Sequence, residues 1–408
     1  MNSILTKENS KNNFIAFIWH GIFLALASNF MDVHTIIPSM LIKAGGNAIL
    51  LGILTTIMVG GSQLMQLFFA GFLSKRRHKK KQLLIGINIR VITLFLLSLM
   101  LYKSSSLSND MIIILIFILT SIFSFSGSYA GICYTDIVGK SIIDKSRKKF
   151  FSIKQTISSV GILISAIVVR ELLKTSSYPN NYVLLLSIAG ILLFIATLGF
   201  WKIKETQVKI KKHDSLLHFL KHIPEEISTN SNLKNYLIII NSVGLGLSFI
   251  PFMILFAKDN FELSYTLIGN ILLYKVIGML ATSLILYKLN KKFEYKKLLY
   301  FSFGLGAIIP ILSLILSNNY LLYQLIFILT GVFMGAFNIA KSGILMEISN
   351  NENRVSYAGI AGAGSIIPTI FPLIAGVLIS TFGYYTTFIL VSAIIISSII
   401  FIKKLNCK

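Results

Sequence analysis

Long runs of apolar residues, separated by short polar connectors, make up most of this sequence. Twelve of these runs approach the roughly 20 residues that a helix needs to cross the hydrocarbon core of a bilayer. The pattern therefore predicts an all-α integral membrane protein with 12 transmembrane helices. The expected spans are residues 14–41, 48–74, 82–102, 111–138, 151–173, 181–202, 235–257, 265–288, 297–317, 320–346, 355–381 and 384–403.

Basic residues are concentrated in alternate connectors, and this asymmetry predicts the orientation of the spans. The connector with the run Lys75–Lys81 belongs to the basic set, whereas the connectors of the other set hold at most about one Lys each. Because basic connectors are retained in the cytoplasm, the basic side is predicted to be cytoplasmic. We therefore expect a multi-pass protein of the cytoplasmic (inner) membrane with both termini in the cytoplasm.

One polar stretch, residues 204–234, is long enough to divide the chain into two sets of six spans. Within it, apolar residues such as Leu216, Leu220 and Ile223 recur near helical spacing, which predicts an amphipathic helix on the membrane surface or against the bundle. A solvated linker is the alternative. The predicted domains are an N-terminal six-helix bundle, a cytoplasmic central loop and a C-terminal six-helix bundle, over residues 1–203, 204–234 and 235–408.

The two halves carry similar residues in a matching order, which indicates a duplication. Asn29 in the first span is echoed by Asn241 in the seventh, and Asp136 at the inner end of the fourth span is echoed by Glu347 after the tenth. Glycines and lysines around the second and eighth spans recur as well, with Gly52, Gly61, Lys75, Lys79 and Lys80 matched by Gly269, Gly278, Lys292, Lys296 and Lys297. Two pseudo-symmetric six-helix bundles are therefore expected, an arrangement found in secondary transporters.

The composition agrees with a membrane protein. Hydrophobic residues make up 55% of the chain, the mean hydropathy is +0.78, and only 13% of residues are charged, about half the fraction of a soluble domain. The net charge of +23 is spread over short connectors instead of one continuous basic face. Contact with anionic lipid head groups therefore explains the charge better than nucleic acid does.

The sequence has no motif of an enzyme. It lacks a phosphate-binding loop, a G-x-S-x-G or H-E-x-x-H motif and a Cys/His cluster. We therefore expect no catalytic residue, no metal and no cofactor. The expected partners are a small-molecule substrate, a coupling proton and membrane lipids but no nucleic acid, and the chain is expected to be a monomer.

Polar residues within the apolar runs are candidates for a substrate or ion site, because an ionisable group in the membrane is costly unless it has a partner or a function. Asp32 lies in the outer half of the first span, near His34, and helical i, i+3 spacing would put it on one face with Asn29. Asn241 is the counterpart of Asn29. Burial raises the pKa of a carboxyl group, so Asp32 could exchange protons; a satisfied carboxylate at the helix end is the alternative.

Lys275 lies close to the membrane midplane, near the middle of the span at 265–288. A lysine at this depth cannot easily reach the interface. We expect it to bind an anionic group of a substrate or, alternatively, to form an ion pair that only holds helices together. Tyr274 is its polar neighbour. Asn338 and Lys341 form an i, i+3 pair in the tenth span, although Lys341 is near enough to the inner end to reach the interface.

The connector at residues 71–84, GFLSKRRHKKKQLL, resembles the signature of the major facilitator superfamily, G-x-L-x-D-R-x-G-R-R-x-x-L. The matching residues are Gly71, Leu73, Arg76, Lys79, Lys80 and Leu83. Two positions depart from the signature, since Lys75 stands where the family has Asp and His78 where it has Gly. The resemblance covers nearly the whole chain and implies the 12-span fold of two six-helix bundles.

In the family, the signature Asp helps to lock the two halves on the cytoplasmic side, and Lys75 cannot take that role. Asp136 is the nearest acid, and it could face Arg76 or Lys79; Glu347 could serve the second half with Lys292 or Arg354. The predicted cytoplasmic gate comprises Gly71, Arg76, Lys79, Lys80, Asp136, Glu347 and Arg354. Alternatively, the acids only balance lysines at the interface, and the connector only anchors the chain.

The resemblance implies a secondary active transporter that moves a small solute by alternating access. Asp32 is then the expected site of proton coupling, and Lys275 the expected contact for an anionic group of the substrate. Two other functions stay open. One is a transport-inactive sensor or interaction protein with the same fold, and the other is a flippase for lipids.

Overall fold

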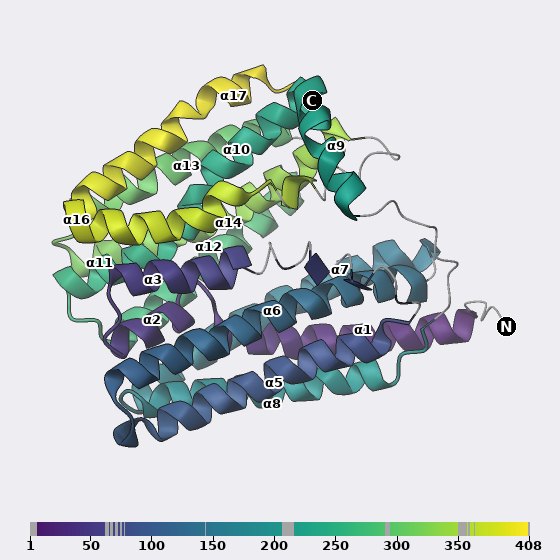
Figure 1. The fold of residues 1–408 in the computed structure, drawn as a ribbon, viewed down its shortest axis with the longest axis horizontal. Helices are drawn as coiled ribbons and strands as arrows, with labels where there is room; N and C mark the ends of the chain where they lie inside the picture. The colour runs from purple at the N-terminus through teal and green to yellow at the C-terminus, as the bar shows by residue number, and fades with distance from the viewer. Residues whose placement is uncertain are drawn as a thin grey trace. The chain divides into compact units, whose positions relative to one another are not determined.

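The computed structural model describes residues 6–61, 65, 68, 69, 72, 73, 76, 78–142, 144–205, 216–289, 294–349, 357, 360–362 and 364–406. All regular structure among these residues is helical, and none of them lies in a strand (Figure 1). The apolar runs of the sequence thus form helices, as expected.

Ten of the described helical segments are long and apolar enough to cross a membrane. Two features bring the spans to the expected twelve. The shorter apolar stretch Ala48–Gly61 occupies the second expected span, and the segment Ile360–Lys404 is long enough for two. These two spans meet at Gly383, whose φ of 78° lies in the left-handed region that glycine adopts without strain. The prediction of an all-α membrane protein with 12 spans is confirmed.

The first compact unit contains residues 1–32 and 61–216. Its helices are α1 (Lys7–Ser28), η1 (Asn29–Met31), α5 (Lys80–Tyr102), η3 (Ser104–Ser106), α6 (Asn109–Ser141), α7 (Asp144–Thr175) and α8 (Asn180–Trp201). α1 packs against α7 and α8, while α5 packs against α6 and α8 (Figure 1). Phe17 of α1 lies at the centre of the packing, with ring centres 6.0 Å from both Phe150 and Phe200.

The second compact unit contains residues 33–60 and 217–408. Its helices are α2 (Ile36–Lys43), α3 (Ala48–Thr55), η2 (Thr56–Gly61), α9 (Leu216–Thr229), α10 (Ser231–Ser248), α11 (Ile250–Asn260), α12 (Tyr265–Leu289), α13 (Tyr295–Ile315), α14 (Tyr320–Ile348), α16 (Ile366–Ser397) and α17 (Ile399–Lys404). α12 and α14 pack closely against each other. Gly331 of α14 lies against the backbone of Lys275 in α12, and Gly278 of α12 against the backbone of Ile328. Missing side chains at these glycines allow the two backbones to approach closely.

The first two spans are interrupted, which differs from the continuous helices expected at 14–41 and 48–74. α1 ends at Ser28, a short 3-10 turn follows, and α2 begins only at Ile36. In the second span, α3 passes into a π-helical turn at Thr56–Gly61. A π-helical turn inside an α-helix often marks a functional position.

The helices between these interruptions, residues 33–60, form a hairpin that packs within the second unit. α2 contacts α11, and α3 contacts α16. Gly52 lies against the backbone of Pro372, and Gly376 lies against the backbone of Ala48. The compact units thus differ from the predicted domains at this hairpin, which was predicted with the first bundle. The predicted domain boundaries stay a prediction.

In each half of the chain, an asparagine near the start of the first span is hydrogen-bonded to the segment that follows the last span. In the first unit, Asn13 Nδ2 donates to the carbonyl of Lys204 at 3.0 Å, and its Oδ1 accepts from the N–H of Lys204 at 2.9 Å. In the second unit, Asn232 makes the same two hydrogen bonds with Asn406, at 3.2 and 3.0 Å. The equivalent contacts agree with two pseudo-symmetric six-helix bundles.

A helix lies in the central segment, where the apolar spacing predicted one. α9 covers Leu216–Thr229 and contains Pro224. Its expected position on the membrane surface stays a prediction.

Candidate functional site

The basic connector at residues 71–84 leads into α5, and the structure describes it in part. Gly71 lies outside the described residues, so its predicted place in a gate is untested. The guanidinium carbon of Arg76 lies 5.3 Å from the centre of the Phe72 ring, a distance at which the cation and the ring attract each other. Arg76 thus contacts a residue of its own connector.

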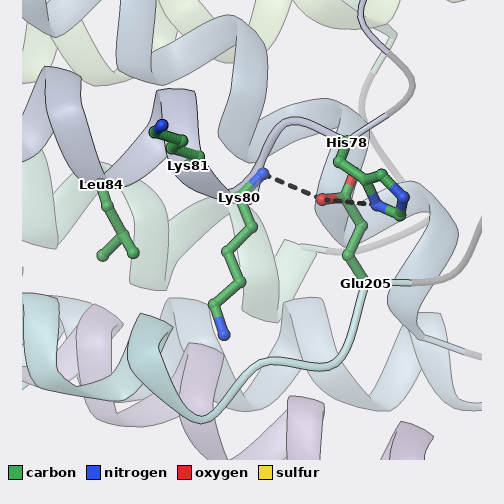
Figure 2. A pocket seen from close by; sticks show the side chains of 5 residues that line it. All are labelled: His78, Lys80, Lys81, Leu84 and Glu205. Carbon is green, nitrogen blue, oxygen red and sulfur yellow. Dashed lines mark hydrogen bonds and ion pairs between the residues drawn. The ribbon is translucent and has the colours of Figure 1, made fainter.

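The first turn of α5 is capped by a carboxylate from another part of the chain. The backbone N–H groups of Lys79 and Lys80 donate to the Glu205 carboxylate at 2.9 Å (Figure 2). The first N–H groups of a helix have no partner within the helix, and the helix dipole favours a negative charge at this end. The Glu205 side chain is only 3% exposed, and His78 Nδ1 lies 3.9 Å from it. A single acid therefore satisfies the start of α5.

Lys80 makes the reverse connection, from the start of α5 to the end of α8. Its Nζ donates to the carbonyls of Trp201 and Ile203 at 2.7 and 2.8 Å. The last carbonyls of a helix lack partners, and a cation is favourable there. Together, Lys80 and Glu205 join two helix ends with charges of the sign that each end prefers. Lys81 and Leu84 complete the lining of an open pocket of about 400 Å³ beside them (Figure 2).

Asp136 lies where the connector needs an acid. Its carboxylate is 3.1 Å from Lys79 Nζ and also pairs with Lys140 one turn further along α6. The side chain is 27% exposed, so water screens the pair only in part. The expected contact between Asp136 and Lys79 is present. Its role in a gate stays a prediction.

Sequence reasoning did not find Glu205. The residue stands in a connector dominated by lysines, and nothing in its spacing links it to the start of the third span. The available signal was that Glu205 is the one acid close behind the sixth span. Its contact depends on how the end of α8 approaches the start of α5, which hydropathy does not encode.

The predicted gate of the second half can be followed only in part. Glu347 is exposed near the end of α14, while Lys292 and Arg354 lie outside the described residues. Lys296 is described, and its Nζ donates to the carbonyl of Leu405, after α17, at 2.6 Å. Lys296 therefore donates a hydrogen bond to a carbonyl that follows the last span, as Lys80 does after the sixth span.

The candidates in the first span lie at its interruption. Asn29 is buried, and its Nδ2 donates to the Ile162 carbonyl at 2.6 Å and to Ser165 Oγ at 2.7 Å, both in α7. Asp32 has an extended backbone with ψ of 124°. The expectation that Asn29 and Asp32 share a helical face is therefore wrong, because the helix ends between them. Asp32 and His34 are half-buried, and they fall in different compact units.

Asn241 joins two spans of the second unit as Asn29 joins two spans of the first. Its Nδ2 donates to the carbonyl of Gly364 at 2.7 Å, and its Oδ1 accepts from the N–H of Ile367 at 2.9 Å. The separation along the chain from Ile162 to Gly364 equals that from Lys204 to Asn406. The partners thus occupy equivalent places in the two halves, and both asparagines hold helices together.

Lys275 is buried within α12, with 3% of its surface exposed. Its backbone packs against Gly331 of α14, and Tyr274 beside it is half-buried. One turn earlier, Asn270 Nδ2 donates to Gln324 Oε1 of α14 at 2.6 Å. The predicted burial of Lys275 at mid-span is confirmed, and polar side chains join the same two helices nearby.

The other two candidates in this unit lie on α14. Asn338 is exposed and Lys341 is half-buried. The Lys341 carbonyl accepts a hydrogen bond from Tyr236 Oη at 3.1 Å, which joins α14 to α10. The structure places Lys275 and Lys341 in one unit, and their predicted roles toward a substrate stay predictions.

Comparison with known proteins identifies the family to which this sequence is similar. The family model described as Major Facilitator Superfamily matches residues 18–250 and 236–405, which together cover nearly the whole chain. Among curated protein sequences, none matches this chain.

Several solved structures share the fold. A single-residue mutant of the nucleoside transporter NupG has a TM-score of 0.69 at 14% identity and covers 98% of this chain and 100% of its own. The inward-open xylose transporter XylE from E. coli has a TM-score of 0.66 at 12% identity, covering 98% and 96%. An auto-inhibited peptide transporter of the POT family has a TM-score of 0.73 at 11% identity, covering 97% of each chain. At such identities the likeness concerns the fold alone.

Proposed function

We propose a transport mechanism from one premise: the chain belongs to the Major Facilitator Superfamily. In this proposal the protein is a secondary active transporter that moves a small solute across the cytoplasmic membrane by alternating access. Both termini lie in the cytoplasm, as the basic connectors predict. A proton gradient supplies the drive, with Asp32 as the residue that gains and loses the proton.

The observation that carries the proposal is the packing of the 33–60 hairpin. It belongs to the first two spans of the chain, yet it is packed within the second unit through Gly52, Gly376 and their backbone neighbours. The spans change conformation at both ends of the hairpin, at residues 29–35 and at the π-helical turn Thr56–Gly61. We infer that this contact closes the outer side and that these two interruptions allow it to open.

Lys275 supplies the contact for the solute in this proposal. Its side chain is buried at the middle of an apolar helix, a depth at which an ionisable group is a candidate for a functional site. In the proposed site, its ammonium group binds an anionic group of the solute and releases it on the other side of the membrane. Lys79, Asp136 and Glu205 take the part of the cytoplasmic gate, where the connector departs from the family signature at Lys75.

The test joins the hairpin covalently to α16. A Cβ built on Gly52 would lie 3.2 Å from Leu373 Cα, but it would also collide with the carbonyl oxygen of Pro372. Cysteines at the two positions can therefore form a disulfide only after the two backbones move slightly apart, and counterflow by the reduced double variant shows whether that movement is tolerated. The double variant is made in a background without Cys133 and Cys407. A solute that raises the thermal unfolding midpoint in a screen is radiolabelled, and its counterflow is followed in proteoliposomes.

We expect counterflow to stop when the Gly52→Cys, Leu373→Cys protein is oxidised and to return on reduction. The two single-cysteine variants are the controls, because oxidation should not affect them. Full counterflow with the disulfide formed would contradict alternating access at this contact. A solute that binds but never exchanges in the unmodified protein would favour the sensor instead.

A further inference from the structure

A lysine in the first unit, Lys154 of α7, directs its charge into the helix bundle. Its Nζ donates to Tyr134 Oη in α6 at 2.9 Å. Tyr134 lies seven residues before the end of α6, about 10 Å along the helix at 1.5 Å per residue. The side chain crosses Gly21 of α1, where a Cβ would lie 3.5 Å from Lys154 Cγ. Lys154 thus contacts three spans and is half-buried among them.

Other aromatic rings lie around the ring of Tyr134, the residue that holds Lys154. The centre of the Tyr134 ring lies 5.5 Å from that of Phe17, 6.0 Å from that of Phe200 and 5.8 Å from that of His20. His20 is buried, and its Nδ1 lies 3.4 Å from the carbonyl of Ala196. In such a weakly polar environment, a charge interacts with a charged partner more strongly than it does in water.

Three other lysines of this unit differ from Lys154 because each pairs with a carboxylate. Lys79 and Lys140 pair with Asp136, and Lys174 pairs with Glu171. Among the residues that the structure describes, no carboxylate lies within 4.0 Å of Lys154 Nζ. An ammonium group has three N–H donors, and the hydrogen bond to Tyr134 uses one. Two donors are therefore available for a ligand.

We propose that Lys154, oriented by Tyr134, binds a carboxylate or phosphate group of the transported solute, which is therefore an organic anion. The inference rests on the proposed function, since it names the solute class of the same transporter. Lys154 was not among the residues predicted for the site, because at the start of a span its sequence position favours contact with the interface.

The test measures which solutes stabilise the purified full-length protein. The anions citrate, succinate and glycerol 3-phosphate are compared with the neutral solutes xylose and uridine. The midpoint of thermal unfolding is followed against solute concentration, because a ligand that binds the folded state raises it. We expect at least one anion to raise the midpoint of the unmodified protein and to require about tenfold or more higher concentration with Lys154→Met.

Three further variants separate a ligand contact from a role in folding. Lys154→Arg keeps the charge and should retain most of the anion effect, while Tyr134→Phe removes only the orienting hydrogen bond and should weaken the effect by a smaller factor. Lys174→Met is the matched control, an exposed lysine near the other end of α7. It should behave as the unmodified protein does. If Lys154→Met does not fold, the comparison of Lys154→Arg and Tyr134→Phe still tests the proposal.

Each outcome decides between the two proposals. An equal anion effect in Lys154→Met and the unmodified protein would overturn the role of Lys154. Stabilisation by neutral solutes alone, or by none of the anions, would overturn the solute class. If neutral solutes bind and also exchange in proteoliposomes, the transport function stands without this inference. Anions that need Lys154 for binding but do not exchange would instead support the inference and contradict transport.

Discussion

Charged residues of this protein serve two distinct purposes at the scale of single side chains. Lys80, Lys296 and Glu205 lie at helix ends, where they satisfy backbone groups that the helices cannot satisfy themselves. Lys154 and Lys275 lie among apolar helices instead, where ionisable residues often belong to functional sites. The first group is therefore expected to affect stability, and the second to affect binding of the solute.

Replacing Lys275 by Ala should abolish transport while the protein still inserts and folds. The reason is that the proposed anionic group of the solute loses its partner, whereas alanine is well accommodated in an apolar helix. Counterflow in proteoliposomes measures the effect, and a monodisperse elution profile checks the fold. Lys275→Arg is the matched variant that keeps the charge. Full transport by Lys275→Ala would remove Lys275 from the proposed site.

Glu205→Ala should lower the stability of the first unit by about 1–2 kcal/mol, because the first turn of α5 loses its cap. The change should appear as a lower midpoint of thermal unfolding. Glu171→Ala is the control, since this acid pairs with Lys174 on an exposed surface where ion pairs contribute little. Equal effects of the two substitutions would show that the Glu205 cap contributes no more to the free energy of unfolding than an exposed ion pair does.

At the scale of helices, two kinds of contact hold the described spans together. Asparagine amides bond to backbone groups of a second span, as Asn29 and Asn241 do, and glycines allow two helix backbones to meet. The hydrogen bonds of the asparagines fix the orientation of one helix relative to the other, because donor and acceptor must align. The second kind gives close packing, but only while no side chain is added.

Gly331→Val should separate α12 from α14 and disturb the backbone of Lys275. Overpacking of this kind costs about 1–3 kcal/mol, so a lower unfolding midpoint and weaker solute binding are expected together. Gly304→Val in α13 is the control, because a Cβ at Gly304 meets no atom within 4 Å. An unchanged midpoint for Gly331→Val would mean that the two helices can move apart at little cost.

Asp136→Lys tests whether the contact between α6 and the basic connector is a gate. The substitution places a third positive charge beside Lys79 and Lys140, and we expect transport to fall by about tenfold, or ~1.4 kcal/mol of activation free energy. Exchanging the charges in the double variant Lys79→Asp, Asp136→Lys should restore part of the rate. Normal transport by Asp136→Lys would leave the connector as an anchor only.

At the scale of the whole molecule, the sequence predicts what depends on hydropathy and charge. The 12 spans follow from the apolar runs, and the ion pair of Asp136 with Lys79 follows because both stand at connector ends on the same predicted side. Glu205 and Lys154 could not be assigned in this way, since their contacts depend on how separate helices approach. The interruption at Asn29–Thr35 was equally hidden, because this stretch contains neither Gly nor Pro to mark the end of a helix.

The orientation of the whole chain can be measured with thiol reagents that do not cross membranes. Ser105→Cys, exposed between α5 and α6, should be labelled in intact cells, because its connector is predicted to be outside. Cys407, near the C-terminus, should react only after the membrane is made permeable. The reverse pattern would place both termini outside and reverse the proposed direction of the two gates.

The hydrogen bonds of Asn13 to Lys204 and of Asn232 to Asn406 have a consequence for the evolution of the chain. Each asparagine ties the first span of its half to the residues that follow the last span of that half. Each half thus carries its own closing contact, as expected if the two halves arose by duplication. Insertions and deletions between residues 206 and 215 therefore leave both closing contacts intact, so this segment can change in length, and acquire regulatory sequence, without loosening either bundle.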